Sequence, residues 1–323
     1  NWRPTGWPSC RPGRKQGLVI GMDLLRTLDD RFVDLPGYPF RPNYLDVPSG
    51  DDGSLRLHYL DEGPAGEPPV LLLHGTPSWS YLYRKMIPPL AAAGFRVVAP
   101  DLPGFGRSDK PVRREDYSYQ RLVDWLTAVV EELDLQDVTL FGQDWGGLIG
   151  LRLVAAQPDR FARLVLANTG LPTGDQEMPE AFYQWKRFSQ KVSRLPIGRI
   201  INGGTVSSLP REVLAAYEAP FPDESYKAGP RVLPTLVPVT LDDPGAAANR
   251  RAWRVLLRWR KPVLTTFSDG DPITRGGDEL LQKYIPGARG RSHATIQEAG
   301  HFLQEDKGEE VAGLVIDFIR QNP

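Results

Sequence analysis

Short apolar runs alternate with amphipathic stretches along the first half of the chain, and this alternation limits the fold more than any other feature. It predicts strands at 55–60, 70–73, 97–99, 138–141 and 164–167, with helices at 80–93, 119–133 and 148–156. Strands that alternate with helices in this way form a parallel sheet covered by helices on both faces. The sequence therefore predicts an α/β fold with a mostly parallel, doubly wound sheet.

The alternation stops near residue 170 and resumes near residue 255, with strands predicted at 262–267 and 294–297 and a closing helix at 309–319. The segment between contains helix-like stretches and many prolines but no convincing buried strand. We therefore predict a core formed by 22–170 and 255–323, interrupted by a helical cap at 171–254. Residues 1–21 carry basic residues and no acid. We predict that they are a disordered or non-native tail, that the natural start is Met22, and that 23–32 is helical.

The composition argues against several classes of protein. The 39 Lys and Arg residues nearly balance the 40 Asp and Glu residues, whereas a nucleic-acid-binding protein has a basic excess. The one cysteine, Cys10, excludes an internal disulfide and a cysteine-based zinc cluster. No apolar run is long enough to span a bilayer, and the N-terminal segment lacks the apolar stretch of a secretory signal. We expect a cytoplasmic monomer or weak homo-oligomer that binds neither nucleic acid nor membrane.

The segment Gly142-Gln143-Asp144-Trp145-Gly146 follows a predicted strand and precedes a predicted helix. Glycines two residues before and two residues after the central residue permit a sharp strand-to-helix turn that exposes the central side chain. This pattern is the nucleophile elbow of α/β-hydrolases, with aspartate where esterases have serine. An Asp helix cap between glycines is the simpler alternative, and the strand–helix context disfavours it. We predict that Asp144 is the nucleophile.

A second motif, His74-Gly75-Thr76-Pro77, directly follows the first buried apolar run. In α/β-hydrolases a loop at this point gives one backbone N–H to the oxyanion hole, and the residue after the nucleophile gives the other. The pattern therefore predicts the N–H groups of Thr76 and Trp145 as the oxyanion donors. An ordinary Gly-Pro turn is the alternative interpretation.

The remaining catalytic groups are predicted after the later strands, in the chain order nucleophile, acid, base that is typical of this fold. His301 follows the last predicted strand and is the best base among the four histidines. Either Asp269 or Asp271 could orient its ring, and we prefer Asp271, which lies between Gly270 and Pro272. A base with an ordinary histidine pKa predicts that activity fades below about pH 6.5.

An aspartate nucleophile indicates attack on a saturated carbon. Such an attack makes an alkyl ester of Asp144, which water can cleave at the carboxyl carbon with the help of an oxyanion hole. Either a haloalkane or an epoxide fits this chemistry. The indole N–H of Trp145 can only donate a hydrogen bond and therefore suits a departing halide, and Trp185 in the predicted cap could lie opposite it. Water is the co-substrate, and neither a metal nor a redox cofactor is required.

The chain resembles the haloalkane dehalogenases, which are α/β-hydrolases with a helical cap, from about Met22 to Ile319. The segments that carry the resemblance are 74–84, 101–111, 142–147, 219–223 and 300–302. Gln143 is the most specific residue, because epoxide hydrolases usually have histidine there. The segment 182–186 looks like the one that supplies the second halide-binding tryptophan, here Trp185. The position of the acid after the strand that precedes the base is that of one subfamily, which supports Asp271.

The resemblance implies hydrolysis of a haloalkane to an alcohol, a halide and a proton, and a pocket lined by Phe182, Leu148, Leu233, Pro234, Val237 and Ile273. Thr76 departs from the family, which usually has Glu or Asn there, and this change could slow ester hydrolysis or shift the substrate. Two alternatives remain at this point. An epoxide hydrolase could use Tyr183, Tyr217 and Tyr226 as proton donors, and a non-catalytic ligand binder is disfavoured because every catalytic residue is present.

Overall fold

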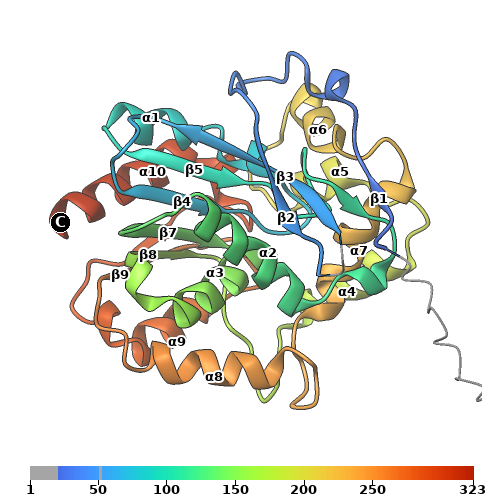
Figure 1. The fold of residues 1–323 in the computed structure, drawn as a ribbon. Helices are drawn as coiled ribbons and strands as arrows, with labels where there is room; N and C mark the ends of the chain where they lie inside the picture. The colour runs from blue at the N-terminus through green and yellow to red at the C-terminus, as the bar shows by residue number, and fades with distance from the viewer. Residues whose placement is uncertain (1–20, 51–52) are drawn as a thin grey trace, which may run out of the picture.

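A twisted sheet runs through the computed structural model, which describes residues 21–50 and 53–323 (Figure 1). The order of its eight strands is β10-β9-β8-β7-β4-β5-β3-β2. Their bounds are β2 Asn43–Pro48, β3 Ser54–Glu62, β4 Pro69–Leu73, β5 Arg96–Pro100, β7 Val138–Gln143, β8 Phe161–Ala167, β9 Val263–Ser268 and β10 Ala294–Ile296. Neighbours from β10 to β5 pair in parallel, whereas β3 pairs antiparallel with both β5 and β2. The predicted α/β class and mostly parallel sheet are confirmed.

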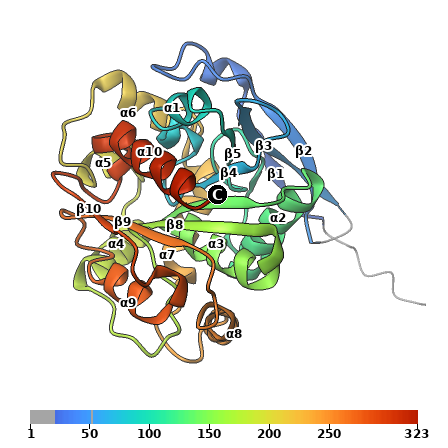
Figure 2. The same ribbon diagram turned by 90° about the vertical axis from the view of Figure 1, so that its left-hand side faces the viewer.

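Helices cover both faces of the sheet (Figure 2). One face is covered by α1 (Ile87–Ala92) and α10 (Leu303–Gln321), and the other by α2 (Tyr119–Glu132), α3 (Trp145–Ala156) and α9 (Gly277–Tyr284), with α8 (Ala246–Leu256) packed on α3. The central strands β4 and β7 are buried along their whole length, as expected of parallel strands covered on both faces. The hydrophobic core therefore lies on both sides of the sheet.

The segment predicted as the cap contains helices and no strand in the structure. It comprises α4 (Glu180–Lys191), α5 (Ile197–Gly203), α6 (Arg211–Glu218) and α7 (Ala228–Leu236), followed by α8. The helices α4 to α7 gather at one end of the sheet (Figure 1). That this segment is a separate cap, with boundaries at 171 and 254, remains a prediction. The predicted tail, apart from Gly21, lies outside the described residues.

The predicted helix 23–32 is wrong, and the predicted helix 80–93 is an α-helix only in its second half. The segment 80–93 forms a 3-10 turn (Ser80–Tyr83) and then α1. Pro88 and Pro89 lie in the first turn of α1, where their missing N–H groups need no partner, so the helix begins there. The segment 23–32 contains strand β1 (Leu24–Leu25) and a 3-10 turn instead of a helix, because β1 pairs with β6 (Lys110–Pro111).

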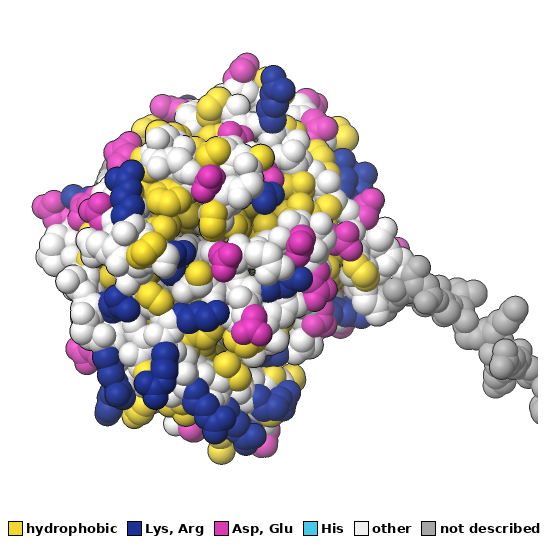
Figure 3. Space-filling model, turned by 60° about the vertical axis from the view of Figure 1, so that its left-hand side comes forward, with side chains coloured by type: hydrophobic (Ala, Val, Ile, Leu, Met, Phe, Trp, Pro, Cys, Tyr) yellow, Lys and Arg dark blue, Asp and Glu magenta, His cyan; other side chains and the backbone are white. Residues whose placement is uncertain are grey.

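The surface mixes charges of both signs. On the face drawn in Figure 3, acidic, basic and apolar side chains are interspersed, apart from a group of Lys and Arg at the lower edge. Among residues 21–50 and 53–323, none of the helices has both the length and the apolar character needed to cross a membrane.

Candidate active site

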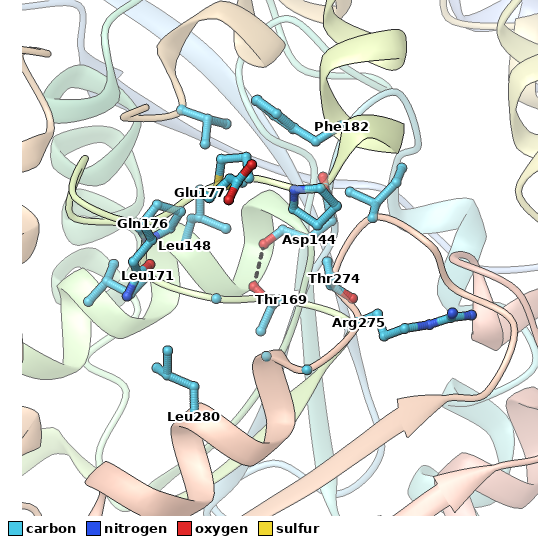
Figure 4. A pocket seen from close by; sticks show the side chains of 18 of the residues that line it. Asp144, Leu148, Thr169, Leu171, Gln176, Glu177, Phe182, Thr274, Arg275 and Leu280 are labelled. Carbon is cyan, nitrogen blue, oxygen red and sulfur yellow. Dashed lines mark hydrogen bonds between the residues drawn. The ribbon is translucent and has the colours of Figure 1, made fainter. Parts of the chain in front are cut away.

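Asp144 lies at the turn between β7 and α3, with a backbone φ of 52°. The turn requires glycine at position 146, because a Cβ atom there would lie 1.8 Å from the carbonyl oxygen of Leu73. The Asp144 N–H donates to the Asn168 carbonyl at 3.0 Å, and the Thr169 hydroxyl donates to the Asp144 carbonyl at 2.8 Å (Figure 4). A non-glycine residue with positive φ is strained, and such strain is concentrated at functional sites.

The carboxylate of Asp144 points back toward the loop that follows β4. The backbone N–H of Thr76 donates to Asp144 Oδ1 at 2.8 Å. A Cβ atom on Gly75 would lie 2.1 Å from the same oxygen, so only glycine allows this approach. Trp145 is buried next to the nucleophile, and its ring packs edge-on against that of Tyr119. Of the two predicted oxyanion donors, Thr76 contacts the carboxylate, and the part of the Trp145 N–H stays a prediction.

His301 lies between two carboxylates. Its Nε2 is 3.5 Å from Asp144 Oδ2, and its Nδ1 is 2.9 Å from Asp271 Oδ2. Asp271 is buried, whereas Asp269 accepts hydrogen bonds from backbone N–H groups, including that of Ala299, within the loop that carries the histidine. The structure therefore brings Asp271, and not Asp269, into contact with the ring.

The two carboxylates determine the charge of His301. Burial opposes the charged ring, but Asp271 and Asp144 outweigh it and raise the pKa of His301 to about 10. Burial alone would also raise the pKa of Asp271, but the His301 ring and hydrogen bonds from Thr274 and Ile273 hold that pKa below its ordinary value. The two carboxylates thus favour the protonated form of the His301 ring, whereas the sequence predicted an ordinary histidine pKa.

Two cavities meet at Asp144. One, of about 230 Å³ and here called the open cavity, is the more open of the two, and its lining includes Gln176, Glu177 and Arg275 (Figure 4). The other, of about 280 Å³ and here called the inner cavity, is lined by Thr76, Trp185 and His301. Both cavities are lined by Asp144, Trp145, Phe182, Val237 and Ile273. Asp144 therefore faces a mostly apolar cavity on one side and the predicted base on the other.

The other predicted pocket residues differ in whether they line a cavity. Leu148 lines the open cavity and Pro234 lines the inner one. Leu233 was predicted to line the pocket, but it is fully buried and lines neither cavity. Neighbouring residues on a helix project about 100° apart, and of the residues of α7 only Pro234 lines a cavity at Asp144.

Several lining residues were missed by sequence reasoning. Leu171, Pro172, Met178 and Leu280 line the open cavity, and Ile200 and Phe302 line the inner one. Ordinary apolar residues in loops and amphipathic helices carry no signal that separates cavity lining from core packing.

The three tyrosines considered as proton donors line neither of the cavities at Asp144. Tyr217 is fully buried, and its hydroxyl donates to Glu305. None of these three tyrosines is therefore placed to donate a proton to a substrate at Asp144, as an epoxide would require.

Comparisons with known proteins agree with this geometry. The alpha/beta hydrolase fold family matches residues 68–308, so the chain belongs to that family. It is 60% identical over 302 residues to a haloalkane dehalogenase of Psychrobacter cryohalolentis, covering 94% of this chain and 100% of the relative. It is 58% identical over 297 residues to haloalkane dehalogenase 1 of Mycobacterium tuberculosis, covering 92% and 99%. Within the α/β hydrolases, the chain belongs to the haloalkane dehalogenases.

A solved structure is also similar. The haloalkane dehalogenase DpaA from Paraglaciecola agarilytica, described as tetrameric, superposes with a TM-score of 0.85 at 38% identity, covering 91% of this chain and 97% of that one. The likeness extends over most of both chains, so it includes the helices that lie over the sheet as well as the sheet itself.

The charge of Asp144 contributes to the raised pKa of His301. We expect Asp144→Asn to lower that pKa, because the buried ring loses one of its two anionic partners while the cost of burial remains. Titration of the His301 ring by NMR measures the change, with the exposed Asp317→Asn as the control. An unchanged pKa in Asp144→Asn would show that the two groups do not interact as described.

Proposed function

We propose that this chain hydrolyses haloalkanes to an alcohol, a halide and a proton through an alkyl ester of Asp144. The observation that carries the proposal is the position of the Asp144 carboxylate. It is bound by the Thr76 N–H at 2.8 Å, lies 3.5 Å from His301 Nε2 and faces two apolar cavities. A carboxylate so placed can attack a carbon atom that enters through the open cavity.

In the first step, a carboxylate oxygen of Asp144 attacks the carbon that bears the halogen. A carbon–oxygen bond forms, the carbon–halogen bond breaks, and the halide leaves with the bonding pair. The leaving group needs no proton, so the protonated state of His301 does not hinder this step. It needs hydrogen-bond donors in a dry site, and we propose that the indole N–H groups of Trp145 and Trp185 supply them.

In the second step, water attacks the carboxyl carbon of the ester while His301 Nε2 accepts one of its protons, which gives a tetrahedral oxyanion. The oxyanion collapses, the bond between the carboxyl carbon and the alkyl oxygen breaks, and the alcohol leaves with the remaining proton of the added water, so that Asp144 is a carboxylate again. Alkylation removes the negative charge of Asp144, which is one of the two charges that raise the pKa of His301. The ring then releases its proton to solvent and becomes a base. Asp271 remains beside Nδ1 and stabilises the imidazolium that forms again. Formation of the ester thus prepares the base that cleaves it.

Thr76 is the residue at which this chain departs from the family. Its N–H bond to the carboxylate provides one of the two oxyanion donors. Its hydroxyl Oγ1 is buried and has no hydrogen-bond partner among the described residues. We propose that this hydroxyl binds a water molecule in the inner cavity, where it takes the place of a longer polar side chain.

Loss of Asp144 and loss of His301 are expected to stop the reaction at different steps. With 1-bromobutane, we expect Asp144→Ala to abolish halide release and His301→Gln to release at most one halide per molecule. The second variant should retain a butyl group on the peptide that contains Asp144, detected by mass spectrometry.

Asp271 and Asp269 lie in the same loop, and only Asp271 contacts the His301 ring, so the second acid serves as a control for the first. Asp271→Asn should slow turnover by orders of magnitude, because the ring loses its partner, whereas Asp269→Asn should retain turnover. Equal turnover by the unmodified chain and His301→Gln would contradict the mechanism.

The halide site has a separate test. In crystals soaked in bromide we expect an anomalous peak between the indoles of Trp145 and Trp185. Trp185→Phe removes one donor and should weaken bromide binding about tenfold, measured by tryptophan fluorescence. Trp253→Phe is the control, because the indole of Trp253 donates to the Leu171 carbonyl and lines neither cavity. Unchanged affinity in Trp185→Phe would remove Trp185 from the halide site.

We also propose that the chain works in the cytoplasm as a monomer or weak homo-oligomer. The similar DpaA structure is described as tetrameric. Analytical ultracentrifugation over a range of concentrations separates these assemblies, and a tetramer that persists on dilution would overturn this part of the proposal.

A further inference from the structure

Asn168 connects the elements that carry the nucleophile, the acid and the base. It follows β8, is fully buried and has a backbone φ of 37°. Its carbonyl accepts the hydrogen bond from the Asp144 N–H. Its Oδ1 accepts from the Ser268 N–H at 2.9 Å, at the end of the strand that precedes Asp271. Its Nδ2 lies within hydrogen-bond distance of the Ser268 hydroxyl and of the carbonyls of Gly300 and His301.

Gln143 reaches the same loop from the neighbouring strand. It directly precedes the nucleophile and is fully buried. Its Nε2 donates to the His301 carbonyl at 3.1 Å and lies 3.2 Å from His301 Nε2. The His301 carbonyl thus accepts from two side-chain amides, one at the end of β7 and one after β8.

We propose that Asn168 and Gln143 are positioning residues for the hydrolytic step, and that together they form an amide clamp on the backbone of His301. The inference rests on the proposed function and adds to it. Asp271 fixes the direction of the ring through Nδ1. The amide clamp holds the backbone of His301 in place, and so sets the distance from the ring Nε2 to the Asp144 carboxylate.

The location of His301 explains why a clamp is needed. The residue lies in a turn between β10 and α10, and a turn is held less firmly than a strand of the central sheet. On the outer side, the Phe302 N–H bonds to the Gly204 carbonyl of the cap segment. The amide clamp holds the inner side, toward the nucleophile. Because both amides are neutral, they hold the loop without adding a charge beside the Asp144–His301–Asp271 group.

The clamp acts on the second step and not on the first. Alkylation requires Asp144 and the halide donors, none of which is anchored by the Asn168 or Gln143 side chain. Hydrolysis requires a base in the correct place, and small displacements of a catalytic group are costly. A variant that loses the clamp should therefore form the ester and cleave it slowly.

The experiment separates the two steps by rapid quench with excess 1-bromobutane. For Gln143→Met and Asn168→Ala we expect steady-state halide release to slow by about 10- to 100-fold. The first, stoichiometric release of halide should change by a smaller factor. Intact-protein mass spectrometry during turnover should find more of each variant as the butyl ester than of the unmodified chain.

Asn249→Ala is the matched control. Asn249 is also a fully buried amide that donates to a carbonyl, that of Pro172, but it does not contact the base loop. The Asn249→Ala variant should have a lower melting temperature but should not accumulate the butyl ester of Asp144. If Asn168→Ala does not fold, Gln143→Met, which keeps the size of the side chain, gives the answer alone.

A parallel loss of both steps, or no extra ester in the clamp variants, would overturn the clamp while leaving the proposed function intact. Absence of halide release from the unmodified chain would instead overturn the proposed function and the clamp together.

Discussion

The hydrogen bond from the Thr76 N–H to the Asp144 carboxylate is the contact on which the rest of the site depends. It joins the ends of two adjacent parallel strands, β4 and β7, where the order of the sheet reverses. Ligands of open α/β sheets bind at such a point because loops from both sides diverge there. The contact is possible only because glycine at positions 75 and 146 lets the backbone and the carboxylate approach closely.

The charges around His301 give the two chemical steps their order. While Asp144 is ionised, its charge and that of Asp271 favour a protonated ring. Once Asp144 is esterified, only Asp271 remains, and the ring can accept a proton from water. In the proposed mechanism the Asp144 carboxylate is the nucleophile, and until it has reacted its charge favours the protonated form of the base. The buried amides of Gln143 and Asn168 hold the loop of His301 in place without adding a charge, so they do not disturb this order of steps.

Much of the fold and the central residues of the site could be predicted from the sequence, because both depend on local patterns. The elbow needs glycines at fixed spacing around Asp144, and the strand–helix alternation requires a parallel sheet. Several of the predictions that failed depended on distant partners. Within the segment 23–32, Leu24–Leu25 became a strand because β6 pairs with it. The proposed role of Asn168 depends on hydrogen bonds to residues about 100 or more positions away along the chain. No local sequence pattern indicates such contacts. The orientation of Leu233 likewise depended on how α7 packs.

The central claim is that the oxygen transferred to the alkyl group comes from Asp144. A single turnover in water enriched in oxygen-18, with enzyme in excess over 1-bromobutane, tests it directly. The account predicts that the alcohol from this first turnover carries ordinary oxygen, and that the peptide containing Asp144 gains the heavy isotope. Heavy oxygen in the first alcohol, with an unlabelled Asp144 peptide, would mean that water attacks the substrate directly and would contradict the account.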